Sequence, residues 1–253
     1  MNSWQNSDAP SVGLFIDDIY QTSIATMGAQ LYDMERVEVL KGPQGAIFGR
    51  NTTGGAVSYI SRRPSQEFDA FLRADIGSYK RFEIEGATGG SLSETVSARL
   101  SFLTTQQGEG HITNRTTGDD NGEVNIAGSR LQLLWEPDES TDVLAKVFWS
   151  RDRSEPTYYS HIGFFTPGYA AGTSTVKHCA SWLNTRIPDP TECVDTFGSS
   201  DPDGDPYAGD YSHRPDTVVH DDATLLNDNI GGTLTVTHDT GNLIFTSLTS
   251  AQA

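Results

Sequence analysis

The stretch ERVEVLKGPQGAIFGRNTTGGAVSYISRRP, from Glu35 to Pro64, decides the fold of this chain. Its first part, residues 34–40, alternates Val37 and Val39 with charged side chains. This two-residue period predicts a β-strand with one apolar face, and we expect that strand to be buried.

Glycines then mark where the chain turns. Gly42-Pro43 ends the first strand, and residues 44–48 have room for one helical turn. Residues 49–55 form a tight loop in which glycine allows positive φ angles and close backbone approach. We expect a second strand over residues 56–61.

Two nucleotide-binding motifs are alternatives to this interpretation. Gly49 and Gly54 have the spacing of a phosphate-binding loop, but Gly55 and Ala56 stand where that motif needs Lys and Ser or Thr. The G-x-G-x-x-G spacing of a dinucleotide site does not occur in this stretch. An α/β fragment with ordinary glycine turns is the remaining alternative, and the sequence after Pro64 argues against it.

The stretch resembles the C-terminal half of the plug domain of TonB-dependent outer-membrane receptors. GLFIDDIY, from Gly13 to Tyr20, resembles the plug strand that lies about 20 residues earlier in that family, and we expect Val12, Leu14 and Ile16 to form its apolar face. The resemblance covers residues 12–64. It implies an outer-membrane receptor of a Gram-negative bacterium, which works with a TonB-type energy-transducing complex and imports a ferric siderophore, haem, cobalamin or a carbohydrate.

The chain after Pro64 alternates apolar and polar residues in segments of about ten residues, the length that a tilted strand needs to cross a bilayer. Trp135 and Trp149 take outward positions at opposite ends of one hairpin, as in an aromatic girdle. Packing in a soluble sandwich is the alternative for both. The expected strands are 68–77, 81–90, 95–107, 129–136, 142–151, 229–238 and 243–248.

The connections between these strands separate a membrane barrel from a soluble sheet. After the short first hairpin they alternate short, long, short, long and short, and outer-membrane barrels have short periplasmic turns and long extracellular loops. The expected fold class is therefore a partial membrane β-barrel of antiparallel up-and-down strands behind a small α/β plug. We assign residues 1–64 to the plug and 65–253 to about seven barrel strands, with a long extracellular loop over 152–228.

The composition agrees with this fold. The hydrophobic content is 36%, below the usual range of about 45–50%, and a membrane barrel needs less because each strand is apolar on one face only. The formal charge of -17 argues against a nucleic-acid partner, which requires a surplus of Lys and Arg. No apolar run is long enough for a transmembrane helix.

Residues 1–10 have neither the positive nor the apolar region of a signal peptide. The resemblance implies an energy-coupling segment and half a plug before Ser11. We therefore expect the chain to be an internal piece of a longer receptor.

Charged residues on or beside the plug motif are the first candidates for a functional role. In the family, such charges pair with the inner barrel wall, and a buried ion needs a partner; a solvated strand face is the alternative. The candidates are Glu35, Arg36, Glu38, Lys41 and Arg50.

Two loops are candidates for contact with the ligand. By resemblance, the polar loop 21–30 lies at the plug apex and faces the ligand, with Tyr20, Gln21, Thr22 and Ser23 at its start, although a passive connection is the alternative. The long loop after residue 152 carries aromatic residues that either face the ligand or pack the loop on itself. They include Tyr158, Tyr159, Phe164 and Phe165.

The same long loop holds both cysteines. An extracellular position is oxidising, so we expect a Cys179–Cys193 disulfide; a metal site with His178 is the alternative. The acidic run 201–210 has carboxylates on alternate residues, but Pro206 and Ser212 stand where an EF-hand needs Gly and Glu. A solvated acidic loop is expected there rather than a calcium site.

No arrangement of Ser, His and Asp, paired carboxylates or Cys and His ligands is specific enough for an enzyme. We therefore expect no catalytic site, no cofactor and no resident metal. The expected partners are the TonB-type complex, outer-membrane lipid and a small-molecule or metal-chelate ligand. A passive channel and a soluble β-rich binding module are the two alternatives.

Overall fold

A computed structural model gives the fold of residues 11–21, 28–114, 120–155, 179–185, 192–193, 216–217 and 224–252. The chain divides into two compact units. The first contains residues up to 106, 125–153 and 225 onward, and the second contains residues 107–124 and 154–224.

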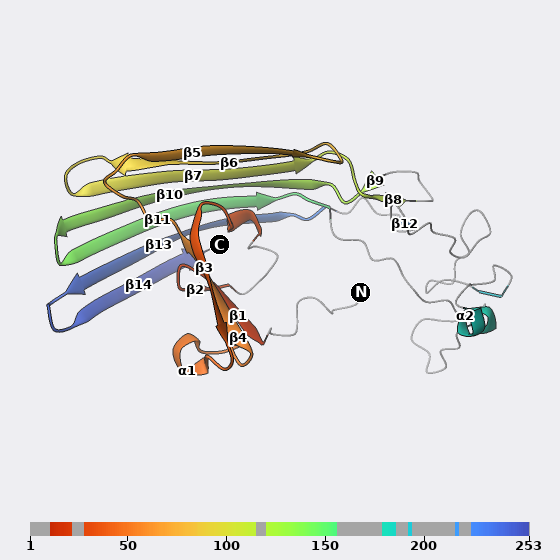
Figure 1. Ribbon diagram of the computed structural model, residues 1–253, viewed down its shortest axis with the longest axis horizontal. Helices are drawn as coiled ribbons and strands as arrows, with labels where there is room; N and C mark the ends of the chain where they lie inside the picture. Colours follow the sequence, from red (N-terminus) through yellow and green to blue (C-terminus); the bar gives the residue numbers. More distant parts are fainter. Residues whose placement is uncertain are drawn as a thin grey trace. The chain divides into compact units, whose positions relative to one another are not determined.

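The first unit contains a seven-stranded sheet in the order β14-β13-β11-β10-β7-β6-β5, which we call the wall (Figure 1). The pairs β5–β6, β10–β11, β11–β13 and β13–β14 are antiparallel. All seven strands expected from the sequence are present. They are β5 (Asp69–Gly77), β6 (Arg81–Ser91), β7 (Val96–Gln107), β10 (Val124–Asp138), β11 (Thr141–Asp152), β13 (Asn227–Asp239) and β14 (Ile244–Gln252).

Burial in the wall is the reverse of that in a water-soluble sheet. Where β10 pairs with β11, Leu131 lies opposite Val147 and both are exposed, whereas Gln132 and its neighbour Lys146 are buried. Trp135 and Trp149 are also exposed, as expected for outward positions. This pattern contradicts the soluble-sandwich alternative. The buried polar face includes Glu85, Ser97, Arg99, Ser101, Arg130, Gln132, Lys146 and Ser150.

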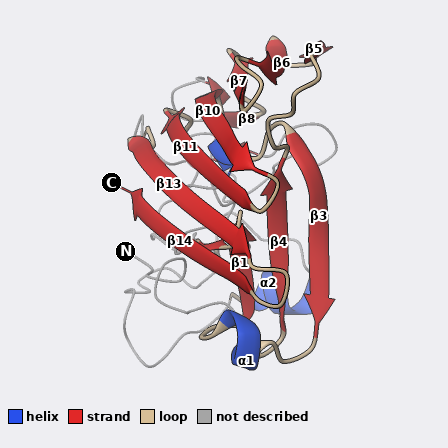
Figure 2. Cartoon of the chain, turned by 90° about the vertical axis from the view of Figure 1, so that its left-hand side faces the viewer, coloured by secondary structure: helices blue, strands red, loops and turns tan. Residues whose placement is uncertain are grey.

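The first unit also contains a four-stranded sheet in the order β2-β1-β4-β3. We call residues 11–64, which hold this sheet, the plug. β1 runs parallel to β4, and β3 runs antiparallel to β4, so β4 lies in the middle of the sheet (Figure 2). The strands are β1 (Val12–Ile16), β2 (Ile19–Tyr20), β3 (Met34–Lys41) and β4 (Gly55–Ser61).

The glycine-punctuated turn is formed as the sequence predicts. Helix α1 (Gly45–Phe48) occupies a single turn, and Gly49 follows it with a φ angle of 76°. Gly55 has a φ of 152°, and a Cβ atom there would overlap the carbonyl oxygen of Leu40 on β3. Glycine at position 55 therefore lets β3 and β4 approach each other where their hairpin closes.

Two expectations about the plug strands are wrong. The segment 11–20 is two strands joined by a turn at Asp17-Asp18, both with positive φ. Within β1, Ile16 is buried as expected, but Val12 is exposed, and Phe15 is also buried and packs on Phe48 with ring centroids 4.9 Å apart.

The expected burial of β3 is also wrong. Val37 is 50% exposed and Val39 61% exposed. β3 is an edge strand with β4 as its single neighbour in the sheet, so the described part of the chain leaves these side chains uncovered.

The second unit contains a three-stranded sheet in the order β12-β8-β9. The strands of this sheet are β8 (Ile112–Asn114), β9 (Asp120–Asn121) and β12 (Asp216–Thr217). The second unit also contains helix α2 (Ala180–Thr185). The connection after β7, which we expected to be a loop, therefore carries a short hairpin. No helix in the described ranges is long and apolar enough to cross a membrane.

Candidate functional site

The plug contacts the polar face of the wall, and the buried contacts come from four neighbouring strands. Each of these strands places at least one long polar side chain on that face, because side chains alternate between the two faces of a strand. The buried wall residues that bind the plug are Glu85 on β6, Arg99 on β7, Arg130 and Gln132 on β10, and Lys146 on β11.

The most buried of these contacts is the ion pair between Asp33 of the plug and Arg99 of the wall. Arg99 donates from Nε to Oδ2 at 2.8 Å and from Nη2 to Oδ1 at 2.7 Å, a two-pronged geometry. The side chains are 2% and 1% exposed. Arg99 also pairs with Asp69 at 3.0 Å. Removing one partner of such a pair leaves the other charge buried and unpaired, which lowers the stability of the fold by about 3–5 kcal/mol.

Arg130 binds the backbone of the plug rather than a carboxylate in the described contacts. Its Nη2 donates to the carbonyl oxygens of Tyr32 at 2.6 Å and Asp33 at 3.2 Å. The guanidinium also lies over the Tyr32 ring, 4.7 Å from its centroid, a favourable cation–π geometry. Burial raises the pKa of Tyr32 to about 12.

Asp17 makes a second buried ion pair, with Lys146 of the wall. The same carboxylate accepts hydrogen bonds from the backbone N–H and the hydroxyl of Ser61 on β4, at 2.8 and 2.7 Å. Burial alone would raise the pKa of Asp17, but attraction to Lys146 and hydrogen bonds from Lys146 and Ser61 outweigh it and hold the pKa below 3.8. Asp17 thus joins β1, β4 and the wall.

A narrow pocket of about 20 Å³ lies between plug and wall near this pair, lined by residues that include Gln21, Tyr32, Arg130 and Lys146. A volume of this size holds about one water molecule. In the described ranges no three His, Cys, Asp or Glu residues come together as metal ligands.

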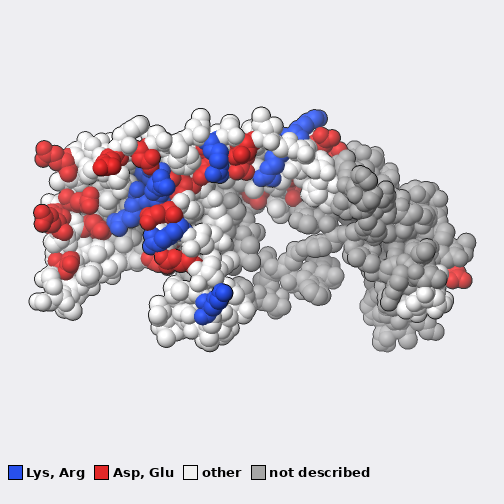
Figure 3. Space-filling model, viewed as in Figure 1, with Lys and Arg blue, Asp and Glu red and all other residues white. Residues whose placement is uncertain are grey.

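The plug charges chosen from the sequence lie elsewhere. Arg36 pairs with Glu35 at 2.8 Å and with Glu38 at 2.7 Å, all within β3 and about half exposed, so these ion pairs do not reach the wall. Lys41 is exposed at the end of the same strand. Figure 3 shows basic and acidic side chains next to one another on the side of the molecule that faces the viewer. Pairing of this cluster with a barrel wall stays a prediction.

The remaining plug candidates pack within the plug where they are described. Arg50 lies over the Tyr20 ring, 5.7 Å from its centroid, and Asn51 donates to the Tyr20 hydroxyl at 2.8 Å. Gln21 is buried and bonds to the Ile19 carbonyl oxygen. Thr22 and Ser23 lie outside the described residues. Contact of this loop with a ligand stays a prediction.

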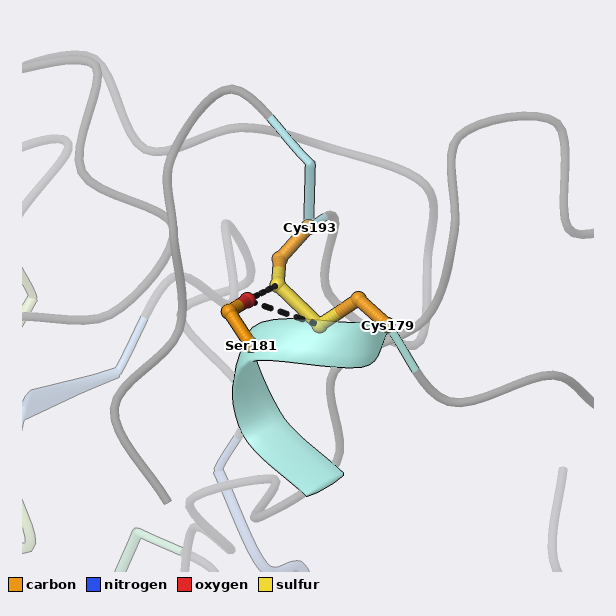
Figure 4. Close-up of a disulfide and its surroundings, with 3 residues drawn as sticks. All are labelled: Cys179, Ser181 and Cys193. Atoms are coloured by element: carbon orange, nitrogen blue, oxygen red, sulfur yellow. Dashed lines mark hydrogen bonds between the residues drawn. A yellow bond between two sulfur atoms is a disulfide. The ribbon is translucent and has the colours of Figure 1, made fainter. Parts of the chain in front are cut away.

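The expected disulfide is present in the second unit. Cys179, next to the start of α2, is bonded to Cys193, and the hydroxyl of Ser181 lies 3.1 Å from the Cys193 sulfur (Figure 4). A disulfide that closes a loop of this length stabilises a fold by about 3 kcal/mol in the chain-entropy model. Outside the described residues lie His178, Tyr158, Tyr159, Phe164, Phe165 and the acidic run 201–210.

Sequence reasoning missed the residues that hold the plug to the wall. Arg99, Arg130 and Lys146 lie at polar positions of alternating strands, but no period tells which of them meets the plug. Asp17 and Asp33 stand at the ends of plug strands, where the backbone has positive φ. The available signal for these contacts is an aspartate at a turn of the plug together with Arg and Lys residues on the polar faces of the wall strands.

The fold and this interface define a class of protein: a plug bound through buried charges to a wall of strands that are apolar outside and polar inside. Residues 3–56 match the family model "TonB-dependent Receptor Plug Domain". The chain thus carries a TonB-dependent receptor plug domain, and the resemblance found from the sequence is confirmed.

Curated relatives agree with this assignment. The chain is 26% identical over 165 residues to the pesticin receptor of Yersinia enterocolitica, an alignment that covers 65% of this chain and 24% of the relative. It is 30% identical over 143 residues to the metal-pseudopaline receptor CntO of Pseudomonas aeruginosa, covering 51% and 18%. The chain therefore spans about a quarter or less of the relatives it matches.

Solved structures share the fold. The ferric yersiniabactin uptake receptor FyuA from Yersinia pestis superposes with a TM-score of 0.65 at 17% identity, over 96% of this chain and 32% of that one. The family resides in the Gram-negative outer membrane and consists of transporters rather than enzymes, in agreement with the prediction that this chain has no catalytic site.

Proposed function

We propose that this chain forms the plug and the first wall strands of an outer-membrane receptor that imports a metal chelate, with a ferric siderophore as the foremost candidate. Uptake is driven by a TonB-type complex that acts on the plug from the periplasm. The complete receptor contains further wall strands, because an open sheet edge is not tolerated in lipid.

The reversed burial of the wall is the observation that carries this proposal. Leu131 and Val147 face outward while Gln132 and Lys146 are buried against the plug. A sheet with an apolar exterior suits lipid, and a polar interior suits a lumen. Because the plug lies on the polar face, a large solute cannot diffuse past it, so passage requires work on the plug.

The chelate class is supported by the names of the relatives. They include receptors for metal-pseudopaline and ferrioxamine, and the structural neighbours include receptors for ferric yersiniabactin and ferripyoverdine. Haem, cobalamin and carbohydrates remain alternatives from the family resemblance. Selectivity lies in loops that vary on a fixed wall, so the proposal names the class and not one siderophore.

Uptake of radiolabelled iron tests this proposal in cells that carry the complete receptor as their single siderophore receptor. We expect at least one ferric siderophore from a hydroxamate, catecholate and mixed-ligand panel to enter, and entry to stop when tonB is deleted. Haem and cobalamin serve as comparison solutes. Uptake of these two alone would exclude the siderophore proposal.

The passive-channel alternative gives a different result in the same cells. A channel would let the solute enter at the same rate with and without TonB, and the rate would rise linearly with concentration. An energised receptor saturates and requires TonB. Undiminished entry in the tonB deletion would therefore favour the channel.

A further inference from the structure

All the polar groups of Asp33 are engaged, and most bind the wall. Its N–H donates to Glu85 Oε1 at 2.8 Å, and its carboxylate receives two hydrogen bonds from Arg99. Its carbonyl oxygen accepts from Arg130 at 3.2 Å and from the N–H of Arg62 at 3.0 Å. The residue is buried and has a φ of 51°, which is uncommon for a residue other than glycine.

The wall is shaped to receive the backbone just before Asp33. A Cβ atom at Gly128 on β10 would overlap the carbonyl oxygen of Ala29 and lie 3.0 Å from the Tyr32 ring. Both Ala29 and Tyr32 are buried. Glycine at position 128 therefore permits a close approach that any other residue would prevent.

These wall groups come from three adjacent strands. Glu85 lies on β6, Arg99 on β7, and Gly128 and Arg130 on β10, and these strands are neighbours in the sheet. We call these four residues the Asp33 socket. They contact one short plug segment, residues 29–33, from several directions.

Apart from the buried Asp17–Lys146 pair, the other described ion pairs between plug and wall are much more exposed. Arg62 pairs with Asp69 at 3.2 Å with both side chains more than 40% exposed, and Arg63 pairs with Asp142 at 3.3 Å with 47% and 30% exposed. Exposed pairs contribute little and tolerate rearrangement. Their geometry does not fix where the plug lies, whereas contacts made by both backbone and side chain of one buried residue do.

We propose that Asp33 is the positioning residue that sets the depth and register of the plug against the wall, and that the Asp33 socket is its receiving site. The assignment concerns how the plug is seated. It holds whichever solute the receptor carries.

Hydrogen exchange in the complete, detergent-solubilised receptor tests the assignment. The amides of residues 28–34 report on the socket, and the amides of β4 report on the plug's own sheet. In Asp33→Asn and in Gly128→Ala we expect exchange at 28–34 to accelerate about tenfold or more, because local opening costs less free energy. Exchange in β4 should stay unchanged.

Gly77→Ala is the matched control for the glycine substitution. A Cβ atom at Gly77 would lie 3.7 Å from the nearest side-chain atom of Arg81, an ordinary contact. We expect this variant to exchange like the parent at both sites. Gly128→Ala also tests the assignment if Asp33→Asn does not fold, because this substitution is in the wall and leaves the plug sequence unchanged.

Two results would overturn the assignment. Unchanged exchange at residues 28–34 in both variants would show that the socket does not hold this segment. Equal acceleration in β4 would show that Asp33 supports the folding of the plug rather than its position. Neither result depends on iron uptake, so a failure of the proposed function is recognised separately, by the uptake assay.

Discussion

The wall and the plug bury opposite kinds of side chain. In the plug, Phe15, Ile16 and Ala56 are buried and the charges of β3 are exposed. In the wall, Arg99 and Lys146 are buried and residues such as Val147 are exposed. Apart from the exposed valines of β3 and the charges that bind the wall, the plug follows the rule of a protein in water, and the wall follows the rule of a sheet between lipid and a filled lumen.

The difference also explains how the two parts hold together. Charged pairs and backbone hydrogen bonds join the plug to the wall at the described contacts. Charges that leave water must be paired. Such an interface is selective in geometry and sensitive to the loss of a single partner.

The largest expected effect comes from removing a charge within the interface. Arg99→Met leaves the Asp33 carboxylate buried without its main partner, and we expect the plug to lose about 3–5 kcal/mol of stability against unfolding. Denaturant unfolding of the complete receptor, followed by the protection of plug amides, measures this loss. A loss below about 1 kcal/mol would mean that water replaces Arg99.

The next largest effect tests the other face of the wall. Val147→Arg places a charge on the outward face near the middle of β11, and we expect folding into lipid vesicles to lose about 2–4 kcal/mol. Thr235→Arg is the matched control, because Thr235 lies on the same face of β13 as the buried Thr233, which pairs with Lys146. A neutral Val147→Arg together with a destabilising Thr235→Arg would reverse the assignment of the two faces.

A smaller effect, with a pH dependence, is expected at Asp17. Because the folded-state pKa of Asp17 is lowered, its charge stabilises the plug bound to the wall. This stabilisation is fully present at pH values above the unfolded pKa of about 4. That stabilisation is lost as pH falls through the lower folded pKa. Asp17→Asn should therefore cost about 1.5–3 kcal/mol at pH 7, the value of hydrogen bonds to a charged group.

The same denaturant unfolding, repeated at pH 7 and near pH 3, separates the charge of Asp17 from its shape. The difference between parent and Asp17→Asn should shrink at the lower pH. A difference that stays constant would show that the asparagine disturbs the Asp17-Asp18 turn, and that the ion pair with Lys146 contributes nothing.

Strand positions could be predicted from the sequence because alternation is local. Every wall strand expected over 68–248 is present, and the ends differ by a few residues, most at β10. The two-residue period gives the faces of a strand whichever solvent each face meets. The short and long connections then separated a barrel from a sandwich.

Contacts between plug and wall could not be predicted in the same way. Asp33 and Arg99 are 66 residues apart, and Asp17 and Lys146 are 129 apart. Which charges meet depends on where the plug sits, and no periodicity in either segment contains that information. The charges of β3 were chosen because they flank a motif, yet Arg36 pairs with its own neighbours.

The smallest expected effect is at Glu38, and it compares the exposed side of the plug with its wall side. Glu38 pairs with Arg36 at 2.7 Å while both side chains are about half exposed, so Glu38→Gln should cost at most about 1 kcal/mol and less at high salt. Denaturant unfolding of the plug in the complete receptor measures this loss of stability at low and high ionic strength.

A loss of about 3 kcal/mol or more in Glu38→Gln, unaffected by salt, would mean that Glu38 has a buried partner. The charges of β3 would then pair with a further part of the wall, as the family resemblance implies, and the plug would be bound by charges on two sides instead of one.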